Sequence, residues 1–255
     1  MDTPLTEGRL DRVGVQTMKA YAALRALILE GQFPPGARLS EMAMVRRLGV
    51  SRTPARMAMI RLKEEGLVEP ASSGGFSVRG FTEFEVLTAI EIRATLEGLA
   101  ARLAAERRLT SPQLEPLRQS IASISDLIAQ PLGKDAAGLY AAMNDRFHAL
   151  LSNLADCEPL SRQLERASAL PFAAPSALIP ARARVSDLNT MLIVAHDQHQ
   201  SVYEAVERHE GTRAESLMRE HTRLASRNLA RVLSNPEALA LVPGWPLIRV
   251  PERAA

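Results

Sequence analysis

Five histidines are concentrated in one part of the chain, and imidazole is a common metal-binding side chain. They are His148, His196, His199, His209 and His221. Three predicted helices each offer an imidazole: His148 lies on the first, His196 and His199 share one face of the second, and His221 lies on the third. Histidines that converge from several helices are how a helical bundle builds a metal site. A solitary histidine is more often a core or surface polar group, so these residues alone leave both interpretations open.

A second group of chemically capable residues is basic. Residues 38–63 carry seven Lys or Arg side chains and one acidic side chain. Ser51, Arg52, Thr53 and Arg56 lie together at the start of a predicted helix in this stretch. Arginine can bind guanine through two hydrogen bonds, serine and threonine reach phosphates or bases, and the free N–H groups of a helix start attract anions. The stretch therefore predicts a surface for a polyanion, and a solvated basic face is the alternative on charge alone.

The elements around this basic group predict a winged helix-turn-helix over residues 1–80. Helices are expected at 18–29, 41–48 and 51–65, and a two-stranded hairpin with a glycine-rich tip follows. On the third helix, apolar side chains recur at the spacing i, i+3, i+4 and i+7, at Ala55, Ala58, Met59 and Leu62. That face would pack in the core, which leaves the arginines on the other face.

Residues 81–235 predict an antiparallel all-helical bundle, so the whole chain should be mostly α. No alternating strand pattern occurs, and six helical stretches are expected. They span 82–108, 111–129, 135–154, 158–170, 186–209 and 212–233. Residues 236–255 are rich in proline and small side chains and should form an extended tail.

Composition excludes several classes of protein. A single cysteine, Cys157, rules out a disulfide framework, and aromatic residues make up only 4% of the chain. The first residues lack the apolar core of a signal peptide, and no run of apolar residues is long enough to span a membrane. A cytoplasmic location is expected. The net charge of +2 conceals an excess of basic residues in the first 80 positions, where 12 Lys/Arg face 8 Asp/Glu.

The N-terminal region resembles the GntR family of bacterial transcription regulators. The matching stretches are GQFPPGARLSE, LGVSRTPAR, RLKEEGLVE and the glycine-bearing wing. The resemblance implies that this region contacts operator DNA and that Gly75 lies at the wing tip. The DNA-binding residues we predict are Arg38, Arg46, Ser51, Arg52, Thr53, Arg56 and Gly75. Two departures leave the operator sequence open. Family members often carry arginine or another polar residue near Met42, and an acidic residue at the position of Met57.

The second region resembles the FCD ligand-binding domain of the FadR-type branch of that family. The matching stretches are EIRATLEGLAARLAAERR, NDRFHALLSNLA and HQSVYEAVERHEGTRAESLMREH. By resemblance, the ligands of a divalent metal ion are Asn144, His148, His199 and His221. Asn144 stands where the family pattern has aspartate, so binding should be weaker, and imidazole donors suit zinc or nickel.

The resemblance also places an effector-contacting arginine at Arg93. Together with a metal ion that has open positions, it would bind the carboxylate of a small organic acid. The alternative for Arg93 is an internal ion pair with Glu91 or Glu97.

These features predict a ligand-responsive, DNA-binding transcription regulator that is not an enzyme. It would act as a homodimer on a palindromic operator of double-stranded DNA and repress a catabolic operon until the acid binds. One alternative is a metal-dependent hydrolase or isomerase on the helical domain, although the sequence has no HExxH or GxSxG motif. Another is a helical interaction protein whose histidines are incidental.

Overall fold

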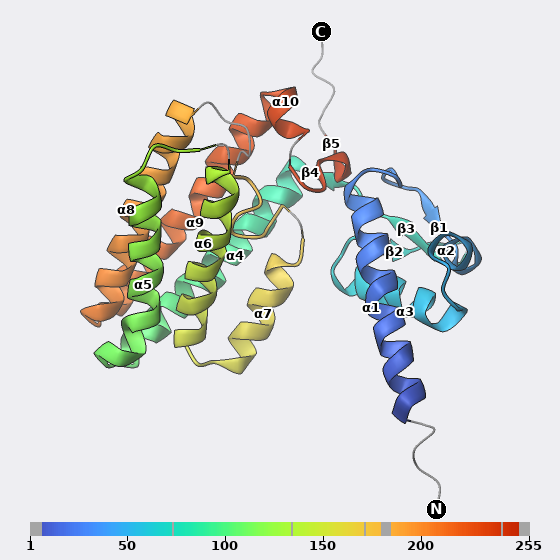
Figure 1. Ribbon diagram of the computed structural model, residues 1–255, viewed down its shortest axis with the longest axis horizontal. Coiled ribbons are helices and arrows are strands. Elements are labelled where there is room, and N and C mark those ends of the chain that lie inside the picture. Colours follow the sequence, from blue (N-terminus) through green and yellow to red (C-terminus); the bar gives the residue numbers. More distant parts are fainter. Residues whose placement is uncertain are drawn as a thin grey trace, which may run out of the picture. The chain divides into compact units, whose positions relative to one another are not determined.

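The computed structural model describes residues 7–72, 74–133, 135–170, 172–179, 185–240 and 242–249. The chain divides into two compact units, Met1–Glu83 together with Pro243–Ala255, and Phe84–Val242. Helices dominate both units, which confirms the mostly α fold (Figure 1). Among the described residues, no helix has the length and apolar character needed to cross a membrane.

The first unit has the elements of a winged helix-turn-helix. They are α1 (Glu7–Leu29), β1 (Arg38–Leu39), α2 (Glu41–Leu48), α3 (Arg52–Glu64), β2 (Val68–Pro70), β3 (Phe76–Val78) and β4 (Phe81–Thr82). The strands β1, β3 and β2 form an antiparallel sheet in that order. The sequence predicted only the β2–β3 hairpin, because a strand of two residues such as β1 shows no alternating pattern.

Local chemistry sets the ends of the helices in this unit. The hydroxyl of Ser40 accepts a hydrogen bond from the backbone N–H of Ala43 at 3.2 Å, as an N-cap does. Gly49 ends α2 in the left-handed conformation, which glycine adopts without steric cost. Ser51 has N-cap backbone geometry at the start of α3, but its hydroxyl makes no capping hydrogen bond. The predicted cap is therefore present in the backbone only, and the hydroxyl stays at the surface.

The C-terminal residues of the chain return to the first unit. The sequence predicted an extended tail from residue 236, but the structure has α10 (Pro236–Leu239), a 3₁₀ helix (Trp245–Leu247) and β5 (Ile248–Arg249). Strand β5 pairs in parallel with β4, and Leu247 is fully buried. The tail folds because it carries apolar side chains that the first unit buries. Residues 250–255 of the predicted tail lie outside the described residues.

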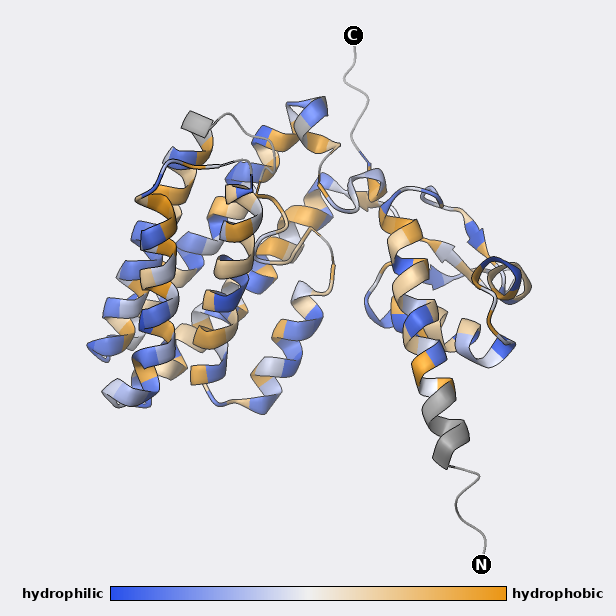
Figure 2. Cartoon of the chain, viewed as in Figure 1, coloured by the Kyte–Doolittle hydropathy of each residue, from blue (hydrophilic) through white to orange (hydrophobic). Residues whose placement is uncertain are grey.

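The second unit is a helical bundle. It contains α4 (Glu83–Glu106), α5 (Ser111–Ile128), α6 (Ala136–Leu154), α7 (Glu158–Ser168), α8 (Val185–Glu207) and α9 (Gly211–Leu233), followed by α10. These bounds agree with the six predicted helices to within a few residues. The helices carry both apolar and polar residues (Figure 2), and the main core cluster joins α4, α5, α6, α8 and α9. These helices position the histidines.

Candidate metal centre and nucleic-acid interface

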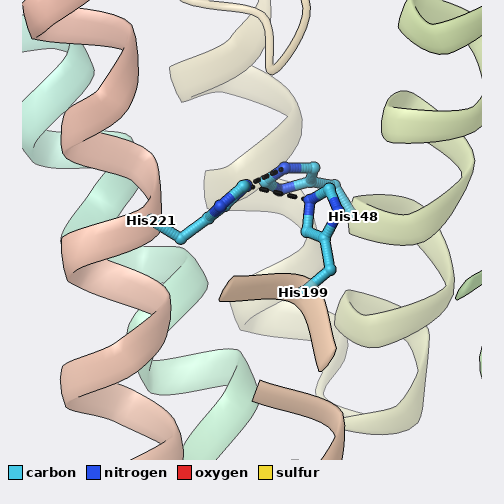
Figure 3. A group of neighbouring side chains, drawn as sticks. All are labelled: His148, His199 and His221. Carbon is cyan, nitrogen blue, oxygen red and sulfur yellow. Dashed lines mark hydrogen bonds between the residues drawn. The ribbon is translucent and has the colours of Figure 1, made fainter. Parts of the chain in front are cut away.

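Three of the five histidines meet inside the helical bundle. His148 on α6, His199 on α8 and His221 on α9 are all buried, and their ligand atoms lie within 4.8 Å of one another (Figure 3). The Nε2 atom of His221 is 3.0 Å from Nε2 of His199 and 3.3 Å from Nε2 of His148. One ring nitrogen from each of three helices therefore faces a common point.

A buried carboxylate orients one of these imidazoles. The Oε1 atom of Glu97 on α4 is 2.9 Å from Nδ1 of His148. Burial raises the pKa of Glu97, but the charge of Arg93 and hydrogen bonds from His148 and Thr222 outweigh this and hold the pKa of Glu97 well below its usual range. An ionised carboxylate can only accept hydrogen bonds, so we assign the proton to Nδ1 of His148. Its Nε2 lone pair then faces the other two histidines, which is the arrangement of a metal-binding histidine.

The other two histidines are held in their neutral form. Burial, and then the neighbouring His148, lower the pKa of His221 to about 3. Burial, and then His221 and His148, also lower the pKa of His199 well below its usual value. A neutral imidazole has a free lone pair on one nitrogen, and this is the form that binds metal ions.

The three histidines fit a divalent metal ion. Two nitrogen ligands at about 2.0–2.1 Å from a tetrahedral ion lie roughly 3.3–3.4 Å apart, and on an octahedral ion roughly 3.0 Å apart. Two of the three separations, 3.0 and 3.3 Å between Nε2 atoms, match this range, and the ligand atoms of His148 and His199 lie within 4.8 Å of each other. Three neutral nitrogen donors suit zinc, nickel or a similar ion.

The fourth predicted ligand and the two other histidines lie in different surroundings. Asn144 is buried one helical turn before His148, and its side-chain N–H₂ group donates to the hydroxyl of Ser176 at 3.1 Å. His196 is also buried, but its Nε2 atom lies 2.7 Å from the hydroxyl of Ser125. His209 is exposed beyond the end of α8. His209 therefore lies away from the three clustered histidines, whereas the ring of His196 lies 6.5 Å from that of His199 but is not among the clustered ligand groups.

Arg93 lies beside the cluster and lines a cavity. Only 1% of its surface is exposed, and its Nη1 atom is 3.0 Å from both carboxylate oxygens of Glu97. The internal ion pair considered for Arg93 is therefore present, whereas Glu91 pairs with Arg219 and Arg223 instead. Arg93 nevertheless lines a cavity of about 1140 Å³ together with Asn144, His148 and His221. The ion pair and a role at the cavity are thus compatible.

In the first unit, α3 presents two chemically different faces. Its core side is the predicted one, because Ala55, Ala58, Met59 and Leu62 are fully buried. Ser51, Arg52, Thr53 and Arg56 are all exposed at or next to its N-terminal end. The only ion pair among them, in the described part of the chain, joins Arg56 to Glu41 on α2 at 3.6 Å. This end of α3 can offer cationic and hydroxyl groups to a polyanion.

The wing lies on the same unit. Arg46 and Arg38 are exposed, and Arg38 donates a hydrogen bond to the carbonyl oxygen of Gly74 at 3.1 Å. Gly74 and Gly75 both have positive φ angles in the turn between β2 and β3. A Cβ atom on Gly75 would lie 2.8 Å from the carbonyl oxygen of Leu39, so only glycine fits there without a shift of the backbone.

Each of the two units matches a known protein family. The model of the family described as "Bacterial regulatory proteins, gntR family" matches residues 16–78. The description "FCD domain" matches residues 88–224, which is more than half of the chain. The chain belongs to the GntR family of bacterial regulatory proteins. This confirms the resemblance found in the sequence.

Two bacterial HTH-type regulators are similar to the chain over more than half of its length. HTH-type transcriptional repressor RspR of Escherichia coli (strain K12) is 27% identical over 233 residues, which cover 89% of this chain and 94% of RspR. An uncharacterized HTH-type transcriptional regulator from the TAR-I ttuE-ttuC' intergenic region of Agrobacterium vitis is 32% identical over 151 residues, 58% of this chain and 86% of that protein.

Solved structures support the fold. E. coli McbR/YncC aligns with a TM-score of 0.59 and 19% identity over 87% of this chain and 98% of that one. The Listeria monocytogenes regulator Lar aligns with a TM-score of 0.61 and 17% identity over 85% and 97%. Together with the family assignment, these findings identify a transcription regulator and give no support to the alternative of a hydrolase or isomerase.

Sequence reasoning missed several residues around the histidines. Glu97 was considered only as an ion-pair partner of Arg93, although it also binds His148 and the hydroxyl of Thr222 at 2.8 Å. Ser176, the partner of Asn144, comes from a turn outside the regular helices. Its position carries no periodic signal. For Glu97 a signal existed, because an acidic residue on the apolar face of a helix needs a buried partner.

Proposed function

We propose that this chain is a repressor that a small organic acid releases from a palindromic operator. The observation that carries the proposal is the gathering of Ser51, Arg52, Thr53 and Arg56 at the exposed N-terminal end of α3. The second helix of a helix-turn-helix reads base edges in the major groove with its N-terminal residues. Arg38, Arg46 and the wing tip at Gly75 would contact the flanking backbone. A homodimer would place two such helices on the two halves of the operator.

The helical unit would serve as the sensor. His148, His199 and His221 would hold a divalent ion, zinc or nickel, with Asn144 or water completing its coordination. The ion would supply a Lewis-acid position for a carboxylate, and Arg93 at the cavity wall would add a cationic group. For the acid to release DNA, it must bind more tightly to the arrangement that does not fit the operator. A coupling of about 1–3 kcal/mol is typical of such regulators.

The DNA-binding half is tested by operator selection from fragments of the source genome, followed by titrations of the selected duplex. Arg52→Ala should lower affinity by about 1–3 kcal/mol, or roughly tenfold to a hundredfold, because a base-contacting arginine is lost. Lys63→Ala is the control, because Lys63 is exposed in the last turn of the same helix. Equal affinity of the Arg52→Ala and Lys63→Ala proteins would contradict the assignment of α3.

The metal half is tested by elemental analysis of purified protein. Wild-type protein should retain about one divalent ion per chain, and His221→Ala should lose it, because a three-histidine site loses one of its ligands. His196→Ala should retain the metal, since His196 is equally buried but bonded to Ser125. Loss of metal from both variants, or from neither, would contradict the ligand assignment.

A further inference from the structure

The cavity beside the histidines extends well beyond them. Residues from α4, α6, α8, α9 and the turn at 175–179 line it, and its volume is about 1140 Å³. On α6, its lining residues Tyr140, Asn144 and His148 follow one another at intervals of four residues, so they share one helix face. Eight residues of α-helix span about 12 Å, so Tyr140 lies that far along α6 from His148.

Residues of α8 and α9 also line the cavity at the end near Tyr140. Leu192 on α8 precedes His199 by seven positions and packs in the same apolar cluster as Tyr140. Helices α8 and α9 pack together and are joined by a short turn, so they run antiparallel. The position level with Leu192 on α9 therefore follows His221 by seven residues, and it is Asn228, which also lines the cavity. Seven residues correspond to about 10 Å, so the cavity has a histidine end and a separate Tyr140 end.

The hydroxyl of Tyr140 has no hydrogen-bond partner among the described residues. Only 2% of Tyr140 is exposed, and its hydroxyl oxygen is buried. Burial raises the pKa of Tyr140, so the phenol stays protonated and can donate a hydrogen bond. A buried hydroxyl without a partner costs stability, whereas phenylalanine would fill the same space at no such cost. The hydroxyl therefore suits a partner that the chain itself does not provide.

The surroundings of the Tyr140 end favour an uncharged partner. Leu178, Ile179 and Leu192 form the apolar part of the wall. Besides Arg93 at the histidine end, the cations of the lining are Arg227 and Arg231. Both are exposed, and Arg227 is paired with Glu220 at 2.7 Å. A second carboxylate here would lose its hydration without gaining a buried cation, which is unfavourable.

We infer that the effector is an acid with an apolar middle and an uncharged oxygen, a hydroxyl or carbonyl, about 10 Å from its carboxylate, and that Tyr140 binds this oxygen. The inference rests on the proposed function, in which the carboxylate binds at the histidine end. Tyr140 would thus select among acids by what they carry at the far end. An acid without an oxygen there would leave the hydroxyl unpaired.

The test is a calorimetric titration of zinc-loaded, full-length protein with acids that differ only at the far end. The eight-carbon probes are octanoate, ω-hydroxyoctanoate and the diacid suberate. The six-carbon probes are hexanoate, ω-hydroxyhexanoate and the diacid adipate. In at least one series the ω-hydroxy acid should bind about tenfold more tightly than the plain acid, since it pairs a buried donor. Tyr140→Phe should abolish this advantage and leave the affinity for the plain acid and for zinc unchanged.

The ligand-free Tyr140→Phe protein should melt at the same temperature as wild type or higher, because its hydroxyl has no partner to lose. A clear loss of stability would show a structural partner and overturn the inference. Equal binding of plain and ω-hydroxy acids, or tightest binding of suberate or adipate, would also overturn it. Plain acids that bind equally well without zinc, or a complete lack of binding, would instead contradict the proposed acid sensor itself.

Discussion

Glu97 has the most partners of the side chains around the three histidines. Its carboxylate accepts hydrogen bonds from Arg93, His148 and Thr222, all of them buried. A buried charge of this kind is stable only because its partners offset the loss of hydration. One residue thus fixes the tautomer of His148, which we propose as a metal ligand, and neutralises Arg93 in the cavity wall.

Glu97→Gln should weaken both the metal site and the fold. The amide no longer balances the charge of Arg93, so the free energy of unfolding should fall by about 3–5 kcal/mol. Metal affinity should fall about tenfold to a hundredfold, because His148 loses its charged orienting partner. Urea denaturation and a zinc competition titration would measure the two effects.

The matched control is Glu91→Gln on the same helix. Glu91 pairs with Arg219 and Arg223, but 46% of its side chain is exposed, so its loss should cost only about 0–1 kcal/mol. If both variants behaved alike, the network around Glu97 would have no special role.

At the scale of single residues, the resemblance to the FCD domain singled out His148, His199 and His221, whereas helical periodicity alone left a metal site and separate polar groups both open. Neither predicted the side chains that surround these histidines. The contacts of Glu97 and Tyr140 depend on how helices far apart in the sequence pack, and periodicity within one helix does not contain that information. His196 shows the limit, because it shares a face with His199 and yet binds Ser125.

At the scale of elements, the wing depends on two glycines with different demands. Both Gly74 and Gly75 have positive φ, but only Gly75 approaches another backbone. A Cβ atom on Gly74 would meet nothing within 4 Å. The β2–β3 turn should therefore tolerate a side chain at the first position better than at the second.

Gly74→Ala should cost about 1–2 kcal/mol, the price of a left-handed alanine. Gly75→Ala should cost roughly 1 kcal/mol more, because its Cβ atom also collides with the carbonyl oxygen of Leu39 and strains the β1–β3 pairing. Calorimetric unfolding of each full-length variant would measure the difference in the transition of the first unit. An equal loss in the two variants would mean that the close approach to Leu39 is unimportant.

Long helices were predictable, and short strands were not. Helices α5, α7 and α9 carry several turns of apolar periodicity, and α4 is rich in alanine. The bounds of the helices followed from proline, glycine and capping residues. Strands β1, β4 and β5 have two residues each, too few for a pattern, and they exist because partners distant in sequence pair with them. Helix α1 also extends beyond its predicted start at residue 18, to Glu7.

At the scale of the whole molecule, the first unit is built from two separate segments of the chain, one from each end. After α10 it returns to add Leu247 and β5, and Pro246 packs against Gly31, where a Cβ atom would lie 2.9 Å from its ring. The helical unit is thus joined to the first unit by two covalent connections, one before α4 and one after α10. The C-terminal residues are part of the structure of the DNA-binding unit.

Leu247→Ala should destabilise the first unit by about 2–5 kcal/mol, because it removes a fully buried side chain. Leu239→Ala is the matched control, since Leu239 is nearly as buried but belongs to the helical unit. Differential scanning calorimetry should show that each variant lowers a different transition. If Leu247→Ala left the transition of the first unit unchanged, the C-terminal segment would not support it.

The central claim is that an organic acid bound at the proposed metal site of the helical unit weakens the affinity of the other unit for DNA. The most direct measurement is the dissociation constant for the selected operator, for zinc-loaded wild type and His221→Ala, with and without the acid that binds most tightly in the calorimetric titrations. The acid should raise the wild-type constant by about 5- to 150-fold, the range of typical coupling energies. His221→Ala should bind with one constant in both conditions. A wild-type affinity that does not respond to the acid would contradict the account.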